Sequence, residues 1–516
     1  MTNALVIGAG HNGLTTAALL AKKGINTTVL EASPHVGGMA ADREFAPGFR
    51  APGCALFVYQ LQSEVVAALK LEQHGLSVAS NALSTVALGE EGQHIKYSEQ
   101  TLTGSGLSQN DVSAYSAFAA QMRTFGRTLA KFNNQKPPKL GYGELGDKVG
   151  LARLALDVRR LGRDDMRELL RVGASNIYDV LDEWFDHEGL KGALALDAVL
   201  GTHLGPRSGN SMLTYLHRLS GSYGSLVQAR VGEGSVANVF AKATRSNGVD
   251  IRTNARVERV VVRNGRAAGV ILESGETLTA DIVVSNADPR TTVMSLVGAR
   301  HFDTGFVRRI HHVRMRGNAV RLNLALSARP DISGLSIADY GQRLLIAPSV
   351  DRVERAFNPA KYGEWSKEAV MEMSLPSEAQ PELAPNGKHI LSATVQYAPY
   401  DLKQGWSADS KRRLTDQLIR QLEERMPGIT DSVEASELLS PVDIERLYGT
   451  SGGHWHHGEL TLDQFMFVRP TYGAAQYAMP LDGLYLCGAG AHPGGGLSGA
   501  AGRNCALEII RREGQS

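Results

Sequence analysis

The sequence is poor in cysteine, in net charge and in long hydrophobic runs, and each shortage excludes a class of protein. The three cysteines, Cys54, Cys487 and Cys505, form no CxxC pair, so they indicate neither a redox-active disulfide nor a zinc site. The 54 basic and 53 acidic residues leave a net charge of +1, which gives no electrostatic reason to expect a nucleic-acid partner. No run reaches the roughly 18 apolar residues of a membrane-spanning helix. We therefore expect a cytoplasmic protein.

Glycines stand at the spacing of a dinucleotide-binding loop near the start of the printed sequence. Residues 4–8 form an apolar run typical of a buried parallel strand, and Gly8, Gly10 and Gly13 follow in the order GxGxxG. In such a loop the first glycine permits a tight turn, the second lets the backbone approach a pyrophosphate, and the third allows close helix–strand contact. The N–H groups at the start of the next helix would point at the phosphates. Because a strand already begins at residue 4, no cleaved leader is expected.

An acidic residue completes this β-α-β unit. The helical pattern of residues 13–23 stops at Gly24, and a second strand over residues 26–30 leads to Glu31. A carboxylate at this position accepts hydrogen bonds from an adenosine ribose and disfavours the 2′-phosphate of NADP. A glycine turn without a ligand is the alternative, but strand, helix and acid are all in register. The unit therefore predicts a bound dinucleotide.

The remaining chain predicts two interleaved domains of an α/β protein. Amphipathic stretches make residues 110–224 mainly helical, and strand patterns return afterwards around a hairpin turn at Asn264-Gly265. We expect a discontinuous Rossmann-like domain from residues 1–60, 225–300 and 470–516, interleaved with a helical-plus-sheet substrate domain from residues 61–224 and 301–469. The expected helices are 112–132, 149–161, 164–183, 211–219 and 410–425, and the expected later strands are 249–253, 256–263, 267–272, 281–285, 319–326, 343–347 and 389–396.

A second glycine-rich segment, GLYLCGAGAHPGGGLSGAAGRNCA from residue 483, gives the chain a family resemblance. With VIGAGHNGL at residue 6, GEGSVANVFAKA at 232 and VVSNADP at 283, it resembles the phytoene desaturase-like flavoproteins, within the wider group that includes amine oxidases. The stretch GGHWHHGELTLDQFMFVRP is similar to a bacterial and mitochondrial branch of that family. The resemblance covers nearly the whole chain. It implies FAD as the cofactor and a fold like that of amine oxidases and phytoene desaturases.

The resemblance also implies which residues hold FAD. Gly8, Gly10 and Gly13 would lie under the pyrophosphate, Glu31 would bind the adenosine ribose, and a helix starting near Ser498 would point its N-terminus at the flavin. The full expected set is Gly8, Gly10, Asn12, Gly13, Glu31, Ala32, Gly37, Gly38, Met39, Val257, Asn286, Gly488, Gly490, Gly495, Gly496, Leu497 and Ser498.

Two positions depart from the family pattern. Met39 stands where arginine often follows the paired glycines, and Ala489 stands where many flavoproteins have an aspartate. The pyrophosphate is therefore expected to rely on backbone N–H groups. The chain also has only one complete GxGxxG, so a second site for NAD(P)H is not encoded in the usual way. The electron acceptor is not identified, and oxygen and a quinone both remain open.

Histidines supply the candidate catalytic residues. His457, in the cluster His454-Trp455-His456-His457, is a candidate for facing the flavin or the substrate, with simple packing as the alternative. His492 lies inside the expected flavin loop and is the second candidate. The cluster lacks a cysteine or a distant partner, so we expect no metal there. Cys487 falls within an apolar strand and is expected to be a core residue.

Arginines and leucines alternate over residues 151–171, and two interpretations of this run stay open. One is peripheral docking on anionic lipid. The other is a solvated helical face, which is favoured because four acidic residues dilute the charge. The arginines are Arg153, Arg159, Arg160, Arg163, Arg167 and Arg171.

These observations predict an FAD-dependent oxidoreductase that removes hydride from a C–C or C–N bond of a largely apolar small molecule. The substrate class is implied by the resemblance. Flavin chemistry needs no obligatory protein base, so the missing acid–base signature does not argue against an enzyme. A flavin amine oxidase is one alternative, and an FAD-bound scaffold or partner-binding protein with little turnover is another. The oligomeric state is not indicated.

Overall fold

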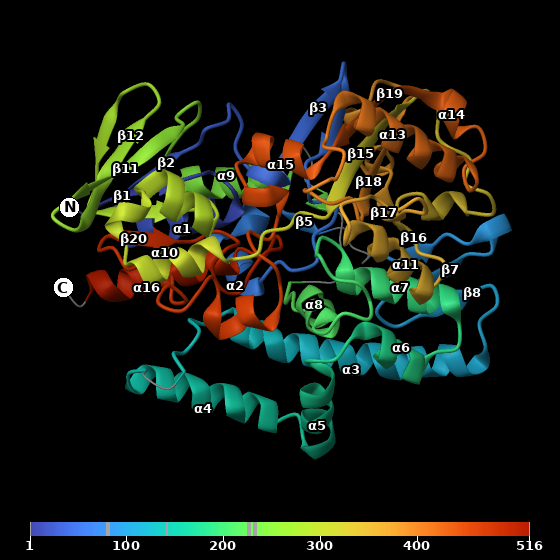
Figure 1. Ribbon diagram of the computed structural model, residues 1–516, viewed down its shortest axis with the longest axis horizontal. Coiled ribbons are helices and arrows are strands. Elements are labelled where there is room, and N and C mark those ends of the chain that lie inside the picture. Colours follow the sequence, from blue (N-terminus) through green and yellow to red (C-terminus); the bar gives the residue numbers. More distant parts are fainter. Residues whose placement is uncertain (1, 79–82, 141–142, 224–228, 231–234, 515–516) are drawn as a thin grey trace.

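The computed structural model describes residues 2–78, 83–140, 143–223, 229–230 and 235–514. The boundary expected at 224–225 and the glycines at 232 and 234 lie outside the described residues. Figure 1 shows a sheet-centred lobe that carries both chain ends, a second sheet-centred lobe beside it, and a row of helices below them. None of the helices built from described residues is long and apolar enough to cross a membrane.

A five-stranded parallel sheet forms the centre of the first lobe. Its strand order is β10-β2-β1-β14-β20, so segments far apart in the sequence lie side by side. Helix α1 packs against α9 and α16, which also come from segments far away in the sequence. The α/β class and the Rossmann-like lobe are confirmed. The bounds are β1 Asn3–Ile7, α1 His11–Ala21, β2 Asn26–Leu30, α9 Val236–Ser246, β10 Asp250–Arg252, β14 Ile282–Ser285, β20 Leu484–Leu486 and α16 Ala500–Glu513.

A three-stranded antiparallel sheet is attached to this lobe. Strands β11 (Val257–Arg263), β12 (Arg266–Leu272) and β13 (Thr277–Thr279) pair in sequence order. Asn264 and Gly265 join the first two strands with φ angles of 50° and 73°, which is the left-handed geometry of a two-residue hairpin turn. The hairpin turn expected at these two residues is confirmed.

An eight-stranded sheet in the order β19-β15-β18-β17-β16-β6-β7-β8 forms the second lobe. Successive side chains of its central strands point to opposite faces of the sheet. Leu322, Leu324 and their neighbours pack under α13, whereas Arg321 and Asn323 lie on the opposite face. The bounds are β6 Thr85–Ala87, β7 Ile95–Tyr97, β8 Leu102–Gly104, β15 Ala319–Leu326, β16 Arg343–Ile346, β17 Val370–Ser374, β18 His389–Gln396, α13 Ala408–Glu423 and β19 Val433–Leu439.

The helical region contains more breaks than the sequence predicts. The single helix expected over residues 164–183 is wrong, because the chain leaves the helix after Val172 and restarts at Ile177. The side chain of Asn176 caps the second helix by accepting a hydrogen bond from the Asp179 N–H. The helices are α3 Gln109–Asn133, α4 Leu145–Arg159, α5 Arg163–Val172, α6 Ile177–Trp184, α7 Glu188–Val199 and α8 Ser211–Arg218.

Shorter elements connect the two lobes. Strands β3 and β4 form a hairpin that contacts β19 and β18 of the second lobe, and α12 follows β17. The remaining bounds are β3 Asp42–Ala46, β4 Phe49–Pro52, α2 Ser63–Leu69, β5 Ser77–Val78, β9 Ala229–Arg230, α10 Thr304–His311, α11 Val350–Ala360, α12 Pro376–Ala379, α14 Ile429–Ser432 and α15 Pro441–Tyr448.

Four buried charged residues cross-link the second lobe to the helical region. Arg343 pairs with Asp197 of α7 and, at 2.6 Å between Nε and Oε2, with Glu372 of β17. Arg218 of α8 binds the same two carboxylates, at 3.1 Å from Asp197 and 2.9 Å from Glu372. Burial alone would raise the pKa of Asp197, but Arg343 and Arg218 outweigh it and hold that pKa below its ordinary value.

Candidate active site

The glycine loop between β1 and α1 packs too closely for side chains. A Cβ atom at Gly13 would overlap the carbonyl oxygen of Gly8, which explains the third glycine of the motif. Helix α1 has Gly10 as its N-cap and no side-chain cap, so the N–H groups of its first turn are left for a ligand. Asn12 is buried, and its Oδ1 accepts from the Gly502 N–H of α16 at 3.4 Å, so this residue joins two helices.

The Glu31 carboxylate binds the backbone of the glycine loop. Its Oε2 accepts a hydrogen bond from the Ala9 N–H at 2.7 Å, and its Oε1 accepts from the Ser33 N–H at 2.8 Å. A carboxylate offers about four acceptor positions, so capacity for a ribose hydroxyl remains. Ala32 lies half-buried beside it. The Ala255 N–H donates to the Glu31 carbonyl oxygen. The start of β11, at Val257, therefore lies close to Glu31.

The paired glycines run alongside the first loop. The Gly37 N–H donates to the Ala9 carbonyl oxygen at 2.9 Å, and Gly37 forms an isolated bridge with Gly10. Gly37 has a φ of 113°, a conformation that favours glycine, and a Cβ there would overlap the side chain of Ala237. Gly38 follows next to Gly10. Met39 is half-buried, and its carbonyl oxygen accepts from the Cys54 N–H at 2.8 Å.

Asn286 joins the N-terminal and C-terminal glycine segments. Its Nδ2 lies 3.5 Å from the Gly8 carbonyl oxygen and would be 2.8 Å from a Cβ at Gly10. Its own carbonyl oxygen would be 2.6 Å from a Cβ at Gly488. Cys487 is fully buried, and burial raises its thiol pKa to about 12, so the expectation of a core cysteine is confirmed.

The second glycine loop closes over the first. A Cβ at Gly496 would overlap Gln60, and a Cβ at Gly495 would overlap His456, so the loop backbone lies directly on these side chains. Leu497 is half-buried, and the backbone carbonyl of Ser498 accepts from the Gln62 N–H at 3.3 Å. The helix expected near Ser498 is α16, which begins at Ala500 after Gly499 as N-cap.

Several buried polar atoms around these loops have no hydrogen-bond partner in the part of the chain that the structure describes. They include His11 Nε2, Gln60 Oε1, His456 Nδ1, His457 Nδ1 and His492 Nδ1. Buried polar atoms are normally hydrogen-bonded, so this group indicates a polar ligand. Burial lowers the pKa of His11 to about 4, so its imidazole is neutral near pH 7. Together with the uncapped start of α1 and with Glu31, the two glycine loops fit a flavin cofactor.

Arg469 fixes the second glycine loop to the histidine segment. Its guanidinium is 1% exposed and donates to the Ala489 carbonyl oxygen at 2.9 and 3.0 Å. It also donates to the carbonyl oxygens of His456, Gly458, Glu459 and Gln464. Burial lowers the pKa of Arg469 to about 9. This residue is not among those expected from the sequence, because its acceptors are backbone atoms of distant segments, which leave no motif.

The two candidate histidines have different surroundings. His457 lies next to Gly490 and close enough to His11, at the start of α1, to lower the pKa of His11. Its pKa is lowered to about 4 by burial, although Asp288 acts in the opposite direction. His492 packs edge-on against Phe132 at 4.7 Å between ring centroids, and its Nε2 lies 3.2 Å from the Phe132 carbonyl oxygen. These contacts give His492 a packing role against α3.

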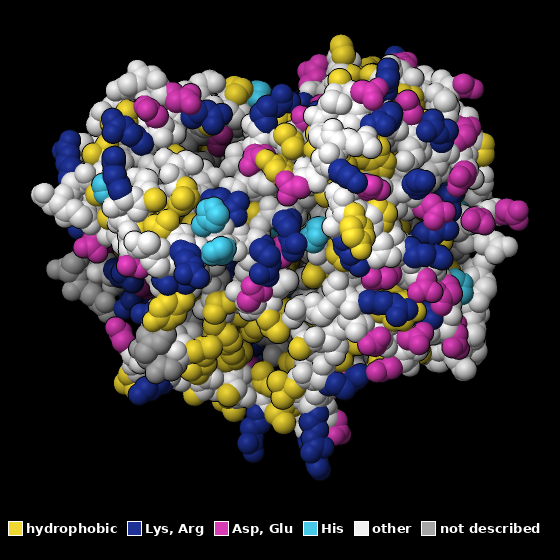
Figure 2. All heavy atoms as spheres, in the orientation of Figure 1, with side chains coloured by type: hydrophobic (Ala, Val, Ile, Leu, Met, Phe, Trp, Pro, Cys, Tyr) yellow, Lys and Arg dark blue, Asp and Glu magenta, His cyan; other side chains and the backbone are white. Residues whose placement is uncertain are grey.

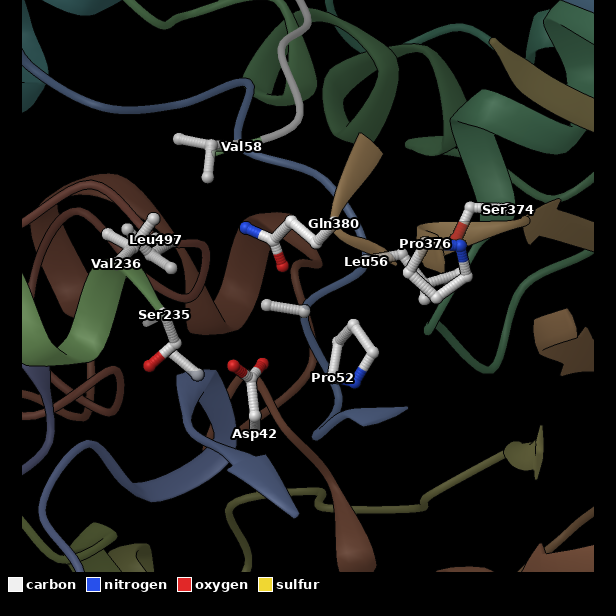
Figure 3. A pocket seen from close by; sticks show the side chains of 12 residues that line it. Asp42, Pro52, Leu56, Val58, Ser235, Val236, Ser374, Pro376, Gln380 and Leu497 are labelled. Atoms are coloured by element: carbon white, nitrogen blue, oxygen red, sulfur yellow. The ribbon is translucent and has the colours of Figure 1, made fainter. Parts of the chain in front are cut away.

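A cavity between the two lobes borders the glycine loops. Figure 3 shows Asp42 of β3, Ser235 at the start of α9 and Gln380 after α12 pointing into the same space. Burial raises the pKa of Asp42 above its ordinary value. The other lining residues are mainly apolar: Ala40, Pro52, Ala55, Leu56, Val58, Val236, Ser374, Pro376 and Leu497.

Two family models match the chain. Residues 6–78 match an NAD(P)-binding Rossmann-like domain, and residues 144–510 match the flavin containing amine oxidoreductases. The fold has solved counterparts. Wild-type putrescine oxidase bound to putrescine superposes with a TM-score of 0.61 at 15% identity, over 99% of each chain.

Curated relatives align over almost the full length. The pyridine nucleotide-disulfide oxidoreductase domain-containing protein 2 of Rattus norvegicus is 32% identical, over 99% of this chain and 93% of the relative. A limonene dehydrogenase chain of Castellaniella defragrans is 25% identical, over 99% and 94%. A lycopene-forming phytoene desaturase of Pseudescherichia vulneris is 26% identical, over 97% and 96%. The resemblance drawn from the motifs is confirmed.

Proposed function

The chain belongs to the flavin containing amine oxidoreductases, and from that premise we propose that it is an FAD-dependent dehydrogenase or desaturase. Its substrate is a largely apolar organic molecule that loses hydride from a C–C or C–N bond. The observation that carries this proposal is the meeting of both glycine segments with Glu31 and with several unpartnered buried polar atoms, next to loop residues that also line the cavity between the lobes.

Separate parts of the chain would hold separate parts of FAD. The N–H groups at the start of α1 bind the pyrophosphate, and Glu31 accepts hydrogen bonds from the adenosine ribose. Met39 and Ala489 offer no charge to the phosphates, so backbone N–H groups take that task. When bound, the isoalloxazine ring supplies the hydride acceptor.

The chain's own residues position the substrate and exclude water. Leu56, Val58 and Pro376 line the cavity and favour an apolar body, while Asp42 and Gln380 provide polar contacts at one side. His457 is neutral near pH 7, and its unpartnered Nδ1 is available as a hydrogen-bond acceptor or donor next to Gly490. No step of the proposal needs an obligatory protein base.

The relatives support both bond types. Limonene dehydrogenase and phytoene desaturase are named for dehydrogenation of hydrocarbons, whereas putrescine oxidase is named for an amine. We keep amine oxidation as the second candidate function because the family model and this structural counterpart favour it. A flavin-bound scaffold with little turnover is the alternative outside enzyme chemistry.

Anaerobic reduction of the flavin by candidate substrates tests the proposal. The purified protein is expected to be yellow and to bleach with one class in a panel of polyenes, amines and cyclic imines. Bleaching by a polyene supports C–C chemistry, and bleaching by an amine supports the second candidate. Flavin that no member reduces would favour the scaffold, and a colourless protein that fails to take up FAD would overturn the proposal.

Replacement of His457 tests whether this side chain faces the substrate or the cofactor. His457→Ala is expected to keep the wild-type flavin content within about twofold, because the ring supplies none of the backbone contacts to phosphate. The rate of anaerobic flavin reduction is expected to fall. Absorbance at the flavin band reports content, and His454→Ala serves as the matched control within the same segment. A folded His457→Ala protein that loses its flavin would place this ring in the cofactor site instead.

A further inference from the structure

Helix α4 is apolar on more than one side and yet is barely covered. Leu145, Val149 and Leu156 are 78%, 42% and 45% exposed. With Ala152 they recur at intervals of three and four residues, which places them in one stripe along the helix. Leu154, about opposite Leu156 in the helical projection, is only half-buried. An apolar stripe along a helix normally faces protein or lipid rather than water.

Other exposed leucines flank α4 in the sequence. Leu140, before α4, is 49% exposed, and Leu170 of α5 is 68% exposed. Figure 1 shows α4 and α5 projecting below α3, and Figure 2 shows hydrophobic side chains gathered over the same part of that face. Large contiguous apolar patches on soluble proteins mark interaction sites. The surface formed by α4, α5 and these leucines is called the lower patch below.

Exposed cations flank the lower patch. Lys148, Arg153, Arg159, Arg163 and Arg167 are exposed, and the structure pairs none of them with a carboxylate among the residues it describes. The nearby acids are largely engaged. Asp157 binds Lys131 and Arg160, Glu168 binds Arg171, and Asp165 accepts from Gln121. Asp164 and Glu144 are exposed.

The first turn of α4 is tied to the body of the protein. Asp147 is buried and accepts hydrogen bonds from the Lys139 N–H at 3.1 Å and the Glu144 N–H at 3.0 Å. It also accepts from Gln476 Nε2 at 2.7 Å, in the segment before β20. The direction of α4 is therefore fixed by a buried carboxylate rather than left to a loose linker.

We propose that the lower patch docks on an anionic lipid bilayer, with the leucines in the boundary region and the arginines at the headgroups. Apolar stripes flanked by lysine and arginine are the composition that such surfaces use. A second copy of this chain fits less well, because a twofold interface would bring two copies of the same cationic face together. This inference concerns where the protein binds, and it does not depend on which bond the protein oxidises.

Vesicle co-sedimentation of the flavin-loaded full chain tests the proposal. Vesicles are phosphatidylcholine alone or phosphatidylcholine with about 30% phosphatidylglycerol, and binding to the anionic vesicles is expected to be at least about tenfold stronger. The variant Leu145→Ser/Val149→Ser/Leu156→Ser is expected to lose at least about tenfold of that binding. The variant Arg153→Gln/Arg159→Gln/Arg163→Gln/Arg167→Gln is expected to bind both vesicle types alike.

A matched variant controls for general loss of surface leucines. Ile337→Ser/Val442→Ser/Leu447→Ser removes three exposed apolar side chains outside the lower patch and is expected to bind like the wild type. Flavin content and thermal melting show that every variant is folded. Absence of binding to either vesicle, or binding that the α4 variant leaves intact, overturns the proposal. A dimer in gel filtration that the α4 variant dissociates, without vesicle binding, assigns the patch to a second copy instead.

Discussion

A Glu31→Arg variant is expected to purify with less than about a tenth of the wild-type flavin content, because it loses the ribose acceptor and adds a cation. The effect is larger than loss of one ligand contact. Glu31 also accepts the Ala9 and Ser33 N–H groups, so the substitution leaves two loop donors without their acceptor. The ratio of flavin absorbance to protein absorbance measures the content.

The matched control for this variant is Glu258→Arg. Glu258 is exposed in β11 of the same lobe, so the same change of charge occurs away from the glycine loop. It is expected to retain its flavin fully. Glu31→Gln keeps acceptor capacity through its amide oxygen and is expected to fall between the two. Full flavin content in Glu31→Arg would show that the cofactor's ribose lies elsewhere.

The second large effect is expected from Glu372→Gln, which should lower the free energy of unfolding by about 3–5 kcal/mol. Glu372 accepts from Arg343 at 2.6 Å and from Arg218 at 2.9 Å, and all three side chains are almost fully buried. Gln is similar in shape but neutral, so it leaves two buried guanidinium groups with one carboxylate, that of Asp197. Urea unfolding followed by circular dichroism measures the difference.

A surface ion pair provides the comparison. Glu434 pairs with Lys388, and both side chains are 36% exposed, so Glu434→Gln is expected to cost less than about 1 kcal/mol. If Glu372→Gln and Glu434→Gln lowered the free energy of unfolding equally, the buried network would not be a stabilising cross-link.

The same network predicts a direction for pH dependence. Because the pKa of Asp197 is held below its ordinary value, its ionised form stabilises the native state above the unfolded-state pKa. That contribution is lost as the pH falls through the lowered native pKa. Wild-type stability is therefore expected to decrease on acidification below the unfolded-state pKa of Asp197.

Local patterns predict the part of the site that local sequence builds. The glycine loop, its helix and Glu31 lie within about 30 residues, so spacing alone carries their geometry. Arg469 binds backbone carbonyl oxygens, which every residue carries, and Gln60 meets Gly496 across most of the sequence. Such contacts depend on the tertiary fold. No residue pattern in either segment announces them.

The same limit explains the helical region. The break after Val172 arises because Asn176 caps a new helix, and capping residues also occur inside loops. Strands β15 and β18 have the bounds that the sequence predicts, because both are short, largely buried runs rich in apolar residues. The sequence shows that α4 carries apolar residues on more than one side. It does not show that the stripe of Leu145, Val149 and Leu156 lies uncovered.

The strand order of the first lobe also sets when the protein can fold. Strand β1 pairs with β14, which pairs with β20, so the sheet stays open until Leu484 has left the ribosome. At about 5–20 residues per second, the roughly 480 residues between β1 and β20 take about 25–95 seconds to synthesise. During that interval the glycine loop after β1 has no second loop to close over it. The two glycine loops can therefore meet only after nearly the whole chain has been synthesised.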